Sequence, residues 1–390
     1  MPASRTVVRR AADPAAARPA PAGPRRAVGR QPAPPILVRQ VRGAVVESVH
    51  RGCVVEARAD GTMLRSIGDV DRPVNLRSCV KPFSLVALVE AGGVEAFELS
   101  SAELAVMASS HSGEDLHVRT IQGVFRRANL SQQLLACGSD GAPLDALTAA
   151  RLARDGEKPG PIRHMCSGQH ASLLLLSRLA DWPLEEYWRD DHPAQAAVRS
   201  AVARAFGTTP ERLVLSIDGC GIPTYAFPLR EVARAFAMLA DPAALPMTDP
   251  RRSLAQPLIR VRDAMLANPE LVAGTRDRLD TSLMKALPGR IVSKGGMEGL
   301  RGVSILAGPR AIGSYGGPSG LALKIEDGGG YDRAPWATTV EALRQAGVLD
   351  GLPLRSLARY HRPRALDPHG RLAGESVADF ELAPVGELIG

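Results

Sequence analysis

Strand-like segments lie at the two ends of the folded part of this chain, and helical periods fill the part between them. Apolar runs from Val45 to Ile67 flank Asp60-Gly61, a dipeptide suited to a tight turn, so this stretch predicts a β-hairpin. Strand character returns at 302–306 and 321–326. Because strands must pair, we expect strands from both ends to form one mixed sheet, with the helical middle packed against it. The predicted fold class is α/β.

Helical patterns dominate the middle of the chain. One helix is predicted from Ser78 to the double glycine Gly92-Gly93, which would stop it. Ser100 and Glu103 have the spacing of a capping box and predict the start of another helix. Further helices are expected at 115–129, 171–180, 193–206 and 256–266, and a final one at 336–346. No Pro/Gly-rich linker divides residues 36–390, so we expect one catalytic domain there.

The N-terminal residues 1–35 consist mainly of Ala, Pro, Arg and Gly. They cannot bury enough surface to offset the entropy lost on ordering, so we expect a disordered tail. The first 30 residues carry seven arginines and one aspartate, which is 7 − 1 = +6 of the net charge of +7. The rest is nearly neutral (7 − 6 = +1), which gives the folded body no electrostatic reason to bind nucleic acid.

Cellular location is constrained by apolar runs and by cysteine usage. No stretch approaches the roughly 18 uninterrupted apolar residues of a membrane span, and the start lacks the apolar region of a secretory signal. The five cysteines are too few and too widely spaced for a disulfide framework. These observations predict a cytoplasmic protein with reduced thiols and no membrane partner.

The first segment that could carry chemistry is Arg77-Ser78-Cys79-Val80-Lys81-Pro82. Positions i and i+3 share a helix face, so the Ser78 hydroxyl and the Lys81 amine could form a hydrogen bond. A lysine with a depressed pKa can accept the serine proton. Pro82 is tolerated only near the first turn of a helix, which predicts that Ser78 lies at an exposed N-terminal end. A helix cap followed by a surface lysine would give the same pattern.

Four further polar segments contain residue types suited to catalysis or metal binding. Ser109 to Glu114 holds three hydroxyls, an imidazole and a carboxylate, although a Ser-rich helix cap is also consistent with it. Cys166 and Cys220 lie in two other segments, where they could equally be buried apolar residues. Lys294 follows a strand end and precedes a glycine turn, a place typical of a lysine that points into a cleft, or of a surface lysine. The segments are Ser109-Ser110-His111-Ser112-Gly113-Glu114, His164-Met165-Cys166-Ser167-Gly168-Gln169-His170, Ser216-Ile217-Asp218-Gly219-Cys220-Gly221-Ile222-Pro223 and Ser293-Lys294-Gly295-Gly296-Met297-Glu298-Gly299.

Taken together, the five segments resemble the bacterial asparaginase II family, the serine–lysine asparaginases first associated with rhizobia. The family pattern has Arg-Ser-x-x-Lys-Pro, Ser-His-Ser-Gly-Glu, Cys-Ser-Gly-Lys-His, Asp-Gly-Cys-Gly-x-Pro and Ser-Lys-x-Gly-x-Glu-Gly segments. All five occur here in that order, the third with one substitution, between Val45 and Tyr331. The resemblance implies a fold like that of serine β-lactamases and glutaminases, and a homodimer.

The resemblance also implies an L-asparaginase-type amidohydrolase with two Ser–Lys pairs in one pocket. Ser78 with Lys81 would form the first pair, and Ser110 with Lys294 the second. Ser78 is assigned as the nucleophile and Lys81 as its base, with Ser110 as the alternative nucleophile. Four residues are expected to contact the substrate: Arg77, His111, Asp218 and Gly219.

Zinc is the one cofactor that the resemblance suggests. Cys166 and Cys220 match two ligands of a zinc site beside the pocket, and the family's third ligand is the lysine of its third segment. This chain has Gln169 at that position. An amide oxygen is a poorer zinc ligand than an amine beside two thiolates, so we expect zinc binding to be weakened or lost, with Asp218 or His170 as the residues that could replace the missing ligand.

Two other interpretations of the sequence stay open. The same serines and lysines could cleave glutamine, a β-lactam or another amide, although the Lys-Thr-Gly triplet of penicillin-recognising enzymes is absent. A non-catalytic relative could bind asparagine without cleaving it, but such a protein has no need of two Ser–Lys pairs. Ammonia release by the purified protein separates the catalytic hypotheses from the last one.

Overall fold

The computed structural model describes residues 32–138, 141, 143–311, 315–329 and 333–385, and the chain from Pro34 onward forms one compact unit. Most of the predicted disordered tail, residues 1–31, lies outside the described residues. Its disorder, and the assignment of 36–390 as a single catalytic domain, therefore stay predictions. The first described strand begins at Ile36.

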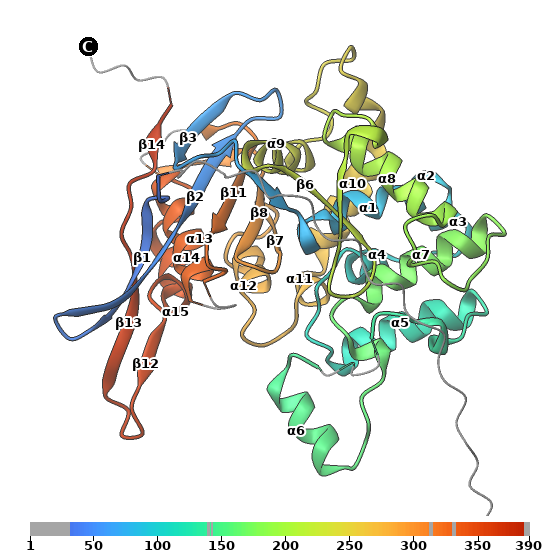
Figure 1. Cartoon of the computed structure of the whole chain (residues 1–390), viewed down its shortest axis with the longest axis horizontal. Helices are drawn as coiled ribbons and strands as arrows, with labels where there is room; N and C mark the ends of the chain where they lie inside the picture. Colours follow the sequence, from blue (N-terminus) through green and yellow to red (C-terminus); the bar gives the residue numbers. More distant parts are fainter. Residues whose placement is uncertain (1–31, 139–140, 142, 312–314, 330–332, 386–390) are drawn as a thin grey trace, which may run out of the picture. The chain divides into compact units, whose positions relative to one another are not determined.

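One large sheet unites the two ends of the chain, which confirms the predicted α/β fold class (Figure 1). All of its described strand pairs are antiparallel. The sheet therefore combines strands from both ends of the chain, as predicted, without a parallel pair among the described strands. The predicted hairpin is present, because β2 pairs with β3, but residues 58–62 connect the strands in place of the two-residue turn that Asp60-Gly61 predicts. The strand order is β12 (Arg364–Leu366), β13 (Leu372–Ala378), β1 (Ile36–Arg42), β2 (Val45–Ala57), β11 (Ser319–Ile325), β8 (Leu300–Ile305) and β7 (Ile291–Gly295). In addition, β3 (Met63–Ile67) pairs with β2, and β14 (Ala383–Pro384) pairs with β3.

Three strands at one end of this sheet were missed by sequence analysis. Structure was expected to begin at Val45, but β1 precedes it, and β12 and β13 follow the helix that was expected to be the last. Arginines interrupt the apolar residues of β1, and a glycine and a glutamate interrupt those of β13. These strands are stabilised by pairing with each other, as in Val38 with Ala378, a contact that no local pattern reveals.

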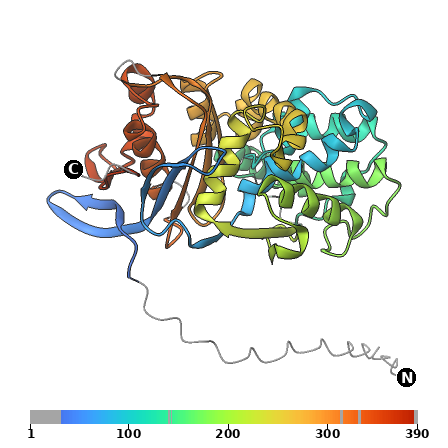
Figure 2. The same ribbon diagram turned by 90° about the horizontal axis from the view of Figure 1, so that it is seen from above.

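Helices cover both faces of the sheet (Figure 2). On one face, α9 (Leu229–Ala240) packs across β2, β8 and β11, and on the other α13 (Ala334–Gln345) packs on β1, β8, β11 and β13. The close approach of α9 depends on two strand glycines. A Cβ at Gly302 would lie 2.2 Å from the Phe236 ring, and one at Gly320 would lie 2.0 Å from the Ala233 carbonyl oxygen.

The predicted helices of the middle are present, with one change, but α6 (Ala146–Arg154), α9 and α12 (Leu279–Ala286) were not predicted. The capping box is present, because the Ser100 hydroxyl accepts from the Glu103 N–H while the Glu103 carboxylate accepts from the Ser100 N–H. The helix predicted from Ser78 is broken into three short pieces and ends at Gly92, which has a left-handed φ of 82°. These pieces are η1 (Arg77–Val80), α1 (Lys81–Ser84) and α2 (Val86–Glu90).

The other described elements complete this region and the edge of the sheet. The helices are α3 (Gly93–Ala96), α4 (Ser101–Met107), α5 (Asp115–Arg127), α6 (Ala146–Arg154), α7 (Ser167–Leu179), α8 (Pro193–Ala205), α10 (Ala255–Ala267), α11 (Pro269–Val272), α12 (Leu279–Ala286), α14 (Gly351–Ser356) and α15 (Ala358–His361). A small sheet of β5 (Val214–Ile217), β6 (Pro223–Pro228) and β4 (Pro73–Asn75) leads into η1. Within the described residues, none of the helices combines the length and the apolar character needed to cross a bilayer.

We predict that Gly320→Ala lowers the free energy of unfolding by about 1–3 kcal/mol, because the added methyl collides with the backbone of α9. Urea unfolding followed by circular dichroism measures the change. Gly317→Ala is the matched control, since a Cβ there meets nothing within 4 Å. Equal stability of the two variants would show that the sheet and α9 can separate without cost.

Candidate active site

The segment that carries Ser78 is fixed by the small sheet before it. Arg77 has a left-handed φ of 46°, which is unusual for a residue with a side chain. Its N–H donates to the Thr224 hydroxyl (3.0 Å), and its Nε donates to Asp218 Oδ1 (2.6 Å). The Gly219 N–H donates to the same carboxylate oxygen at 2.6 Å. The structure therefore brings three of the four predicted substrate-contacting residues together beside Ser78.

Ser78 is buried, which corrects the expectation that it lies at an exposed helix end. Its exposed fraction is 4%, and Lys81 is fully buried. The prediction failed because η1 packs against β6 and against the ends of β7 and β8, which cover it. Pro82 does occupy the first turn of α1, as expected from its missing N–H.

Two buried amines converge on the hydroxyl of Ser110. Lys294 Nζ lies 2.8 Å from Ser110 Oγ, and Lys81 Nζ lies 3.2 Å from the same atom. Lys81 also donates to the Ser109 carbonyl (2.8 Å), and Lys294 to the Gly295 carbonyl (2.7 Å). Both lysines are fully buried, so neither is the surface residue that the sequence left open.

Burial lowers the pKa of Lys294 to about 7, because desolvation disfavours its charged form and the positive charge of Lys81 adds to this effect. Near neutral pH a large share of Lys294 is therefore neutral. A neutral amine within hydrogen-bond distance of a serine hydroxyl can accept its proton.

Of the two predicted Ser–Lys pairs, the structure contains one as a hydrogen bond. The Ser110–Lys294 contact is present. The predicted Ser78–Lys81 contact is not found among the hydrogen bonds of the described residues, because Lys81 bonds Ser109, Ser110 and the Cys166 sulfur (3.2 Å) instead. The roles assigned to the four residues stay predictions.

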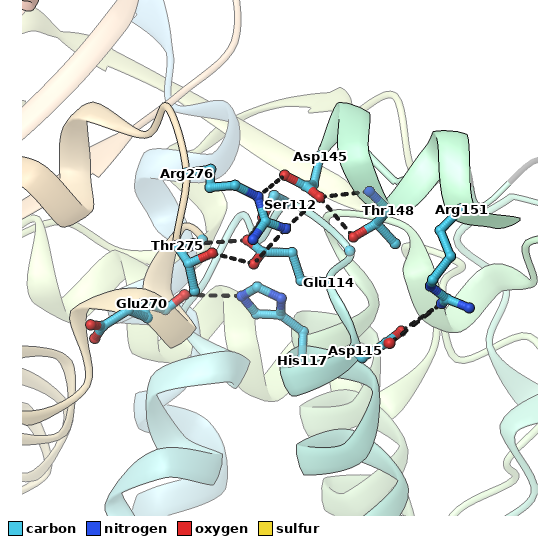
Figure 3. Close-up of polar contacts among 12 residues, drawn as sticks. Ser112, Glu114, Asp115, His117, Asp145, Thr148, Arg151, Glu270, Thr275 and Arg276 are labelled. Atoms are coloured by element: carbon cyan, nitrogen blue, oxygen red, sulfur yellow. Dashed lines mark hydrogen bonds and ion pairs between the residues drawn. The ribbon is translucent and has the colours of Figure 1, made fainter.

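A polar network holds the Ser110 segment against the loop before α12 (Figure 3). The Glu114 carboxylate accepts from the Ser112 hydroxyl (2.6 Å) and the Thr275 N–H (2.8 Å), and it pairs with Arg276 (3.2 Å). Arg276 also forms two hydrogen bonds with Asp145, at 2.8 and 2.6 Å. Gly274 lies so close to this segment that a Cβ there would be 2.1 Å from Ser112 Oγ.

His111, predicted to contact the substrate, is engaged within the protein. The Gly113 N–H donates to its Nδ1 (3.1 Å), which leaves Nε2 as the donor to Ser167 Oγ (2.9 Å). Burial holds its pKa well below the usual value, so the imidazole is neutral. The ring stacks on His117 with centroids 4.7 Å apart. Its contact with substrate stays a prediction, while its visible task is to fix the Ser110 segment against α7.

Several polar residues of this region escaped sequence analysis. Arg278 donates to the Ser110 carbonyl (2.7 Å), and Asp280 and Arg301 form a buried ion pair near Lys294. Charged residues of alternating sign occur from Arg276 to Asp280, around the start of α12. This run is the local signal that could have indicated Arg278 and Asp280 as site residues. The run alone is equally typical of a solvated surface.

The predicted zinc ligands lie beside the lysines but form an incomplete ligand set. The Cys220 thiol hydrogen bonds to Cys166, and this bond, with the charge of Lys81, holds the pKa of Cys166 well below its usual value. Gln169 directs its amide nitrogen toward Ser84 Oγ (3.5 Å). Within the described ranges, no three His, Cys, Asp or Glu side chains are grouped so that they could hold a metal. The residues present therefore do not fit a zinc site with three protein ligands.

Comparison with known proteins identifies the family. A family model described as L-asparaginase II matches residues 38–378. The chain therefore belongs to the L-asparaginase II family, as the sequence motifs predicted. A search of curated proteins finds no match.

Solved structures give a distant likeness only. Mglu in its L-glutamate-binding form is 17% identical with a TM-score of 0.34, over 82% of this chain and 65% of that chain. A probable glutaminase of Bacillus subtilis is 13% identical with a TM-score of 0.32, over 73% and 83%. The match to native Mglu in 4.3 M NaCl, at 17% identity and a TM-score of 0.31, spans 77% of this chain and 63% of the length of that chain.

We predict that the purified protein holds less than one zinc ion per chain and that chelation leaves its activity unchanged. The reason is that Gln169 replaces an amine ligand by an amide, which binds zinc poorly beside two sulfurs. Elemental analysis before and after chelation measures both effects. Gln169→Lys should raise the zinc content, and Gln169→Met, which adds no nitrogen donor, should not. Stoichiometric zinc whose removal abolishes activity would contradict the prediction.

Proposed function

We propose that this protein is an asparaginase that hydrolyses the side-chain amide of L-asparagine to aspartate and ammonia through a serine acyl-enzyme. The observation that carries the proposal is the placement of Ser110 between two buried amines. A Ser–Lys arrangement of this kind generates a nucleophile at neutral pH without a histidine. Family membership supplies the reaction class, and the substrate is the finer part of the proposal.

In the first step, the Ser78 oxygen attacks the amide carbonyl carbon and forms the C–O bond, while its proton passes to Lys81. Ser78 is assigned as the nucleophile because it matches the serine of the family's Arg-Ser-x-x-Lys-Pro segment, and Ser110, which contacts both amines, is the alternative. The Ser110 hydroxyl is already bonded to both amines. It can therefore carry a proton between Lys81 and Lys294. As the C–N bond breaks, the leaving nitrogen takes the proton that Lys81 accepted, directly or through Ser110 and Lys294, and ammonia departs.

In the second step, water attacks the acyl carbon while an amine accepts one of its protons. The bond between that carbon and the Ser78 oxygen then breaks as the proton returns to the oxygen, which regenerates Ser78 and releases aspartate. Charge on either amine disfavours charge on the other, so the pair can share one proton between the steps. Donors from Lys294 and Ser110 can also stabilise the negative oxygen that develops on the carbonyl.

Binding of the amino-acid part of the substrate is assigned to the predicted Arg77–Asp218 pair. The two side chains are partly exposed, with fractions of 22% and 11%. An α-ammonium group suits the Asp218 carboxylate, and an α-carboxylate suits the Arg77 guanidinium. Gly219 has no side chain that would block this approach. A homodimer and a cytoplasmic location are further proposals, the latter supported by five cysteines that are all free.

We predict that the purified protein releases ammonia from L-asparagine with a kcat/KM about 10- to 200-fold higher than from L-glutamine, because glutamine has one additional methylene group. A coupled ammonia assay over asparagine, glutamine and a β-lactam measures it. Faster turnover of another amide would keep the amidohydrolase and overturn the substrate. Asparagine binding by calorimetry without ammonia release would support a non-catalytic relative.

We predict that Ser78→Ala and Lys81→Ala each reduce kcat by roughly 10³-fold or more, because each removes a participant of the same step. Ser177→Ala and Lys324→Ala are the controls, since Ser177 is a buried serine whose hydroxyl has no partner and Lys324 is a lysine of β11. Mass mapping of quenched acyl-enzyme should place the adduct on Ser78. An adduct on Ser110 would instead make Ser110 the nucleophile.

A further inference from the structure

The buried carboxylate of Asp280 accepts hydrogen bonds from the residues on both sides of Lys294. Asp280, from α12, accepts from the Ser293 hydroxyl through Oδ1 (2.6 Å) and from the Gly295 N–H through Oδ2 (3.0 Å). These two residues flank Lys294 on β7. Asp280 is 5% exposed, so its two bonds form where water cannot compete with them.

Arg301 completes this arrangement from the neighbouring strand. It lies on β8 opposite Gly295 and forms an ion pair with Asp280, and its own exposed fraction is 6%. A glycine is required at 295 for these side chains to come so close. A Cβ there would lie 2.9 Å from Arg301 Nη1 and 3.3 Å from Asp280 Oδ2.

We propose that Asp280 is a positioning residue for Lys294: it fixes the backbone of β7 so that the Lys294 amine meets the Ser110 hydroxyl. The negative charge of Asp280 also acts on that amine. This inference rests on the proposed function, in which Lys294 accepts a proton that Ser110 carries from Lys81. Asp280 acts through Lys294 and does not itself touch the substrate.

The geometric part of the inference follows from where Lys294 lies in its strand. Lys294 is the next-to-last residue of β7, and a strand end frays unless it is fastened. The two bonds from Asp280 fasten the residues on either side of it. Misplacement of a catalytic group by about 1 Å can cost about 10²-fold in rate. A carboxylate that pins a strand end therefore has a direct effect on turnover.

The electrostatic part depends on every charged or ionisable group that faces Lys294. Burial and the charge of Lys81 lower the pKa of Lys294, while Asp280 is the nearest acid that raises it. Without Asp280 the pKa would fall below its present value of about 7. The groups that influence Lys294 are Lys81 on α1, Cys79 on η1, and Arg278 and Asp280 around the start of α12.

The pH–rate profile tests the electrostatic effect of Asp280, because loss of a purely structural contact would not shift the pH at which activity rises. Lys294 must be deprotonated to accept a proton, so activity should rise as pH increases through about 7. Asp280→Asn keeps the size of the side chain and removes the charge. We expect this acid limb to move to lower pH by about one unit, and kcat at the optimum to fall about 10- to 100-fold.

Ser293→Ala separates positioning from charge, and it keeps the inference testable if Asp280→Asn does not fold. This variant removes one bond to Asp280 and leaves the carboxylate in place. We expect a fall in kcat of about 10-fold with the acid limb unmoved. Glu56→Gln is the matched control, because Glu56 is a buried acid with arginine and serine partners far along the sheet. Its profile should equal that of the wild type.

The outcomes distinguish this inference from the proposed function. If the wild type releases no ammonia from any amide, the proposed function fails first. If the wild type is active and Asp280→Asn folds with an unchanged pH limb and an unchanged kcat, the inference is overturned while the function stands. A wild-type kcat in Ser293→Ala would likewise overturn the positioning role.

Discussion

The amines of Lys81 and Lys294 meet at the Ser110 hydroxyl inside the protein, where water solvates neither charge. Buried lysines lower stability unless they lose a proton or gain partners. Here the partners are serine oxygens, backbone carbonyls and a nearby carboxylate. The fold must hold these groups in place against the repulsion between the amines. The contacts that hold the end of β7 and the hydrogen bonds of Glu114 keep these groups in place.

The three elements that meet at this point come from distant parts of the chain. Lys81 comes from α1, Ser110 from the loop after α4, and Lys294 from the last strand of the large sheet. A different feature holds each of them in place. Pro82 lies in the first turn of the Lys81 helix, the Glu114 carboxylate bonds the Ser110 segment to Thr275, and Asp280 of α12 bonds the strand of Lys294. No single element carries the site, so its geometry depends on the packing of α9, α10 and α12 against the sheet.

Local chemistry predicted much of this molecule. The hairpin of β2 and β3, the Ser100–Glu103 capping box and several helices followed from residue patterns, and the five motifs identified the family. Of the contacts at the two amines, the family resemblance predicted the one between Ser110 and Lys294, and the others did not follow. The spacing of Ser78 and Lys81 predicted a pair, but the tertiary fold directs Lys81 toward Ser110. The charge run that contains Asp280 is equally typical of a surface, and its partners Ser293 and Arg301 are brought to it only by the packing of α12 against the sheet.

The pairing of β1 with β13 has a consequence for how the chain folds. Val38 lies opposite Ala378, so one side of an early strand stays unpaired until nearly all of the chain has been synthesised. Contacts between such distant residues form slowly, because a long loop must close first. During that interval β1 and β2 expose a free strand edge to other nascent chains. Expression at high rate should therefore favour aggregation of incomplete chains.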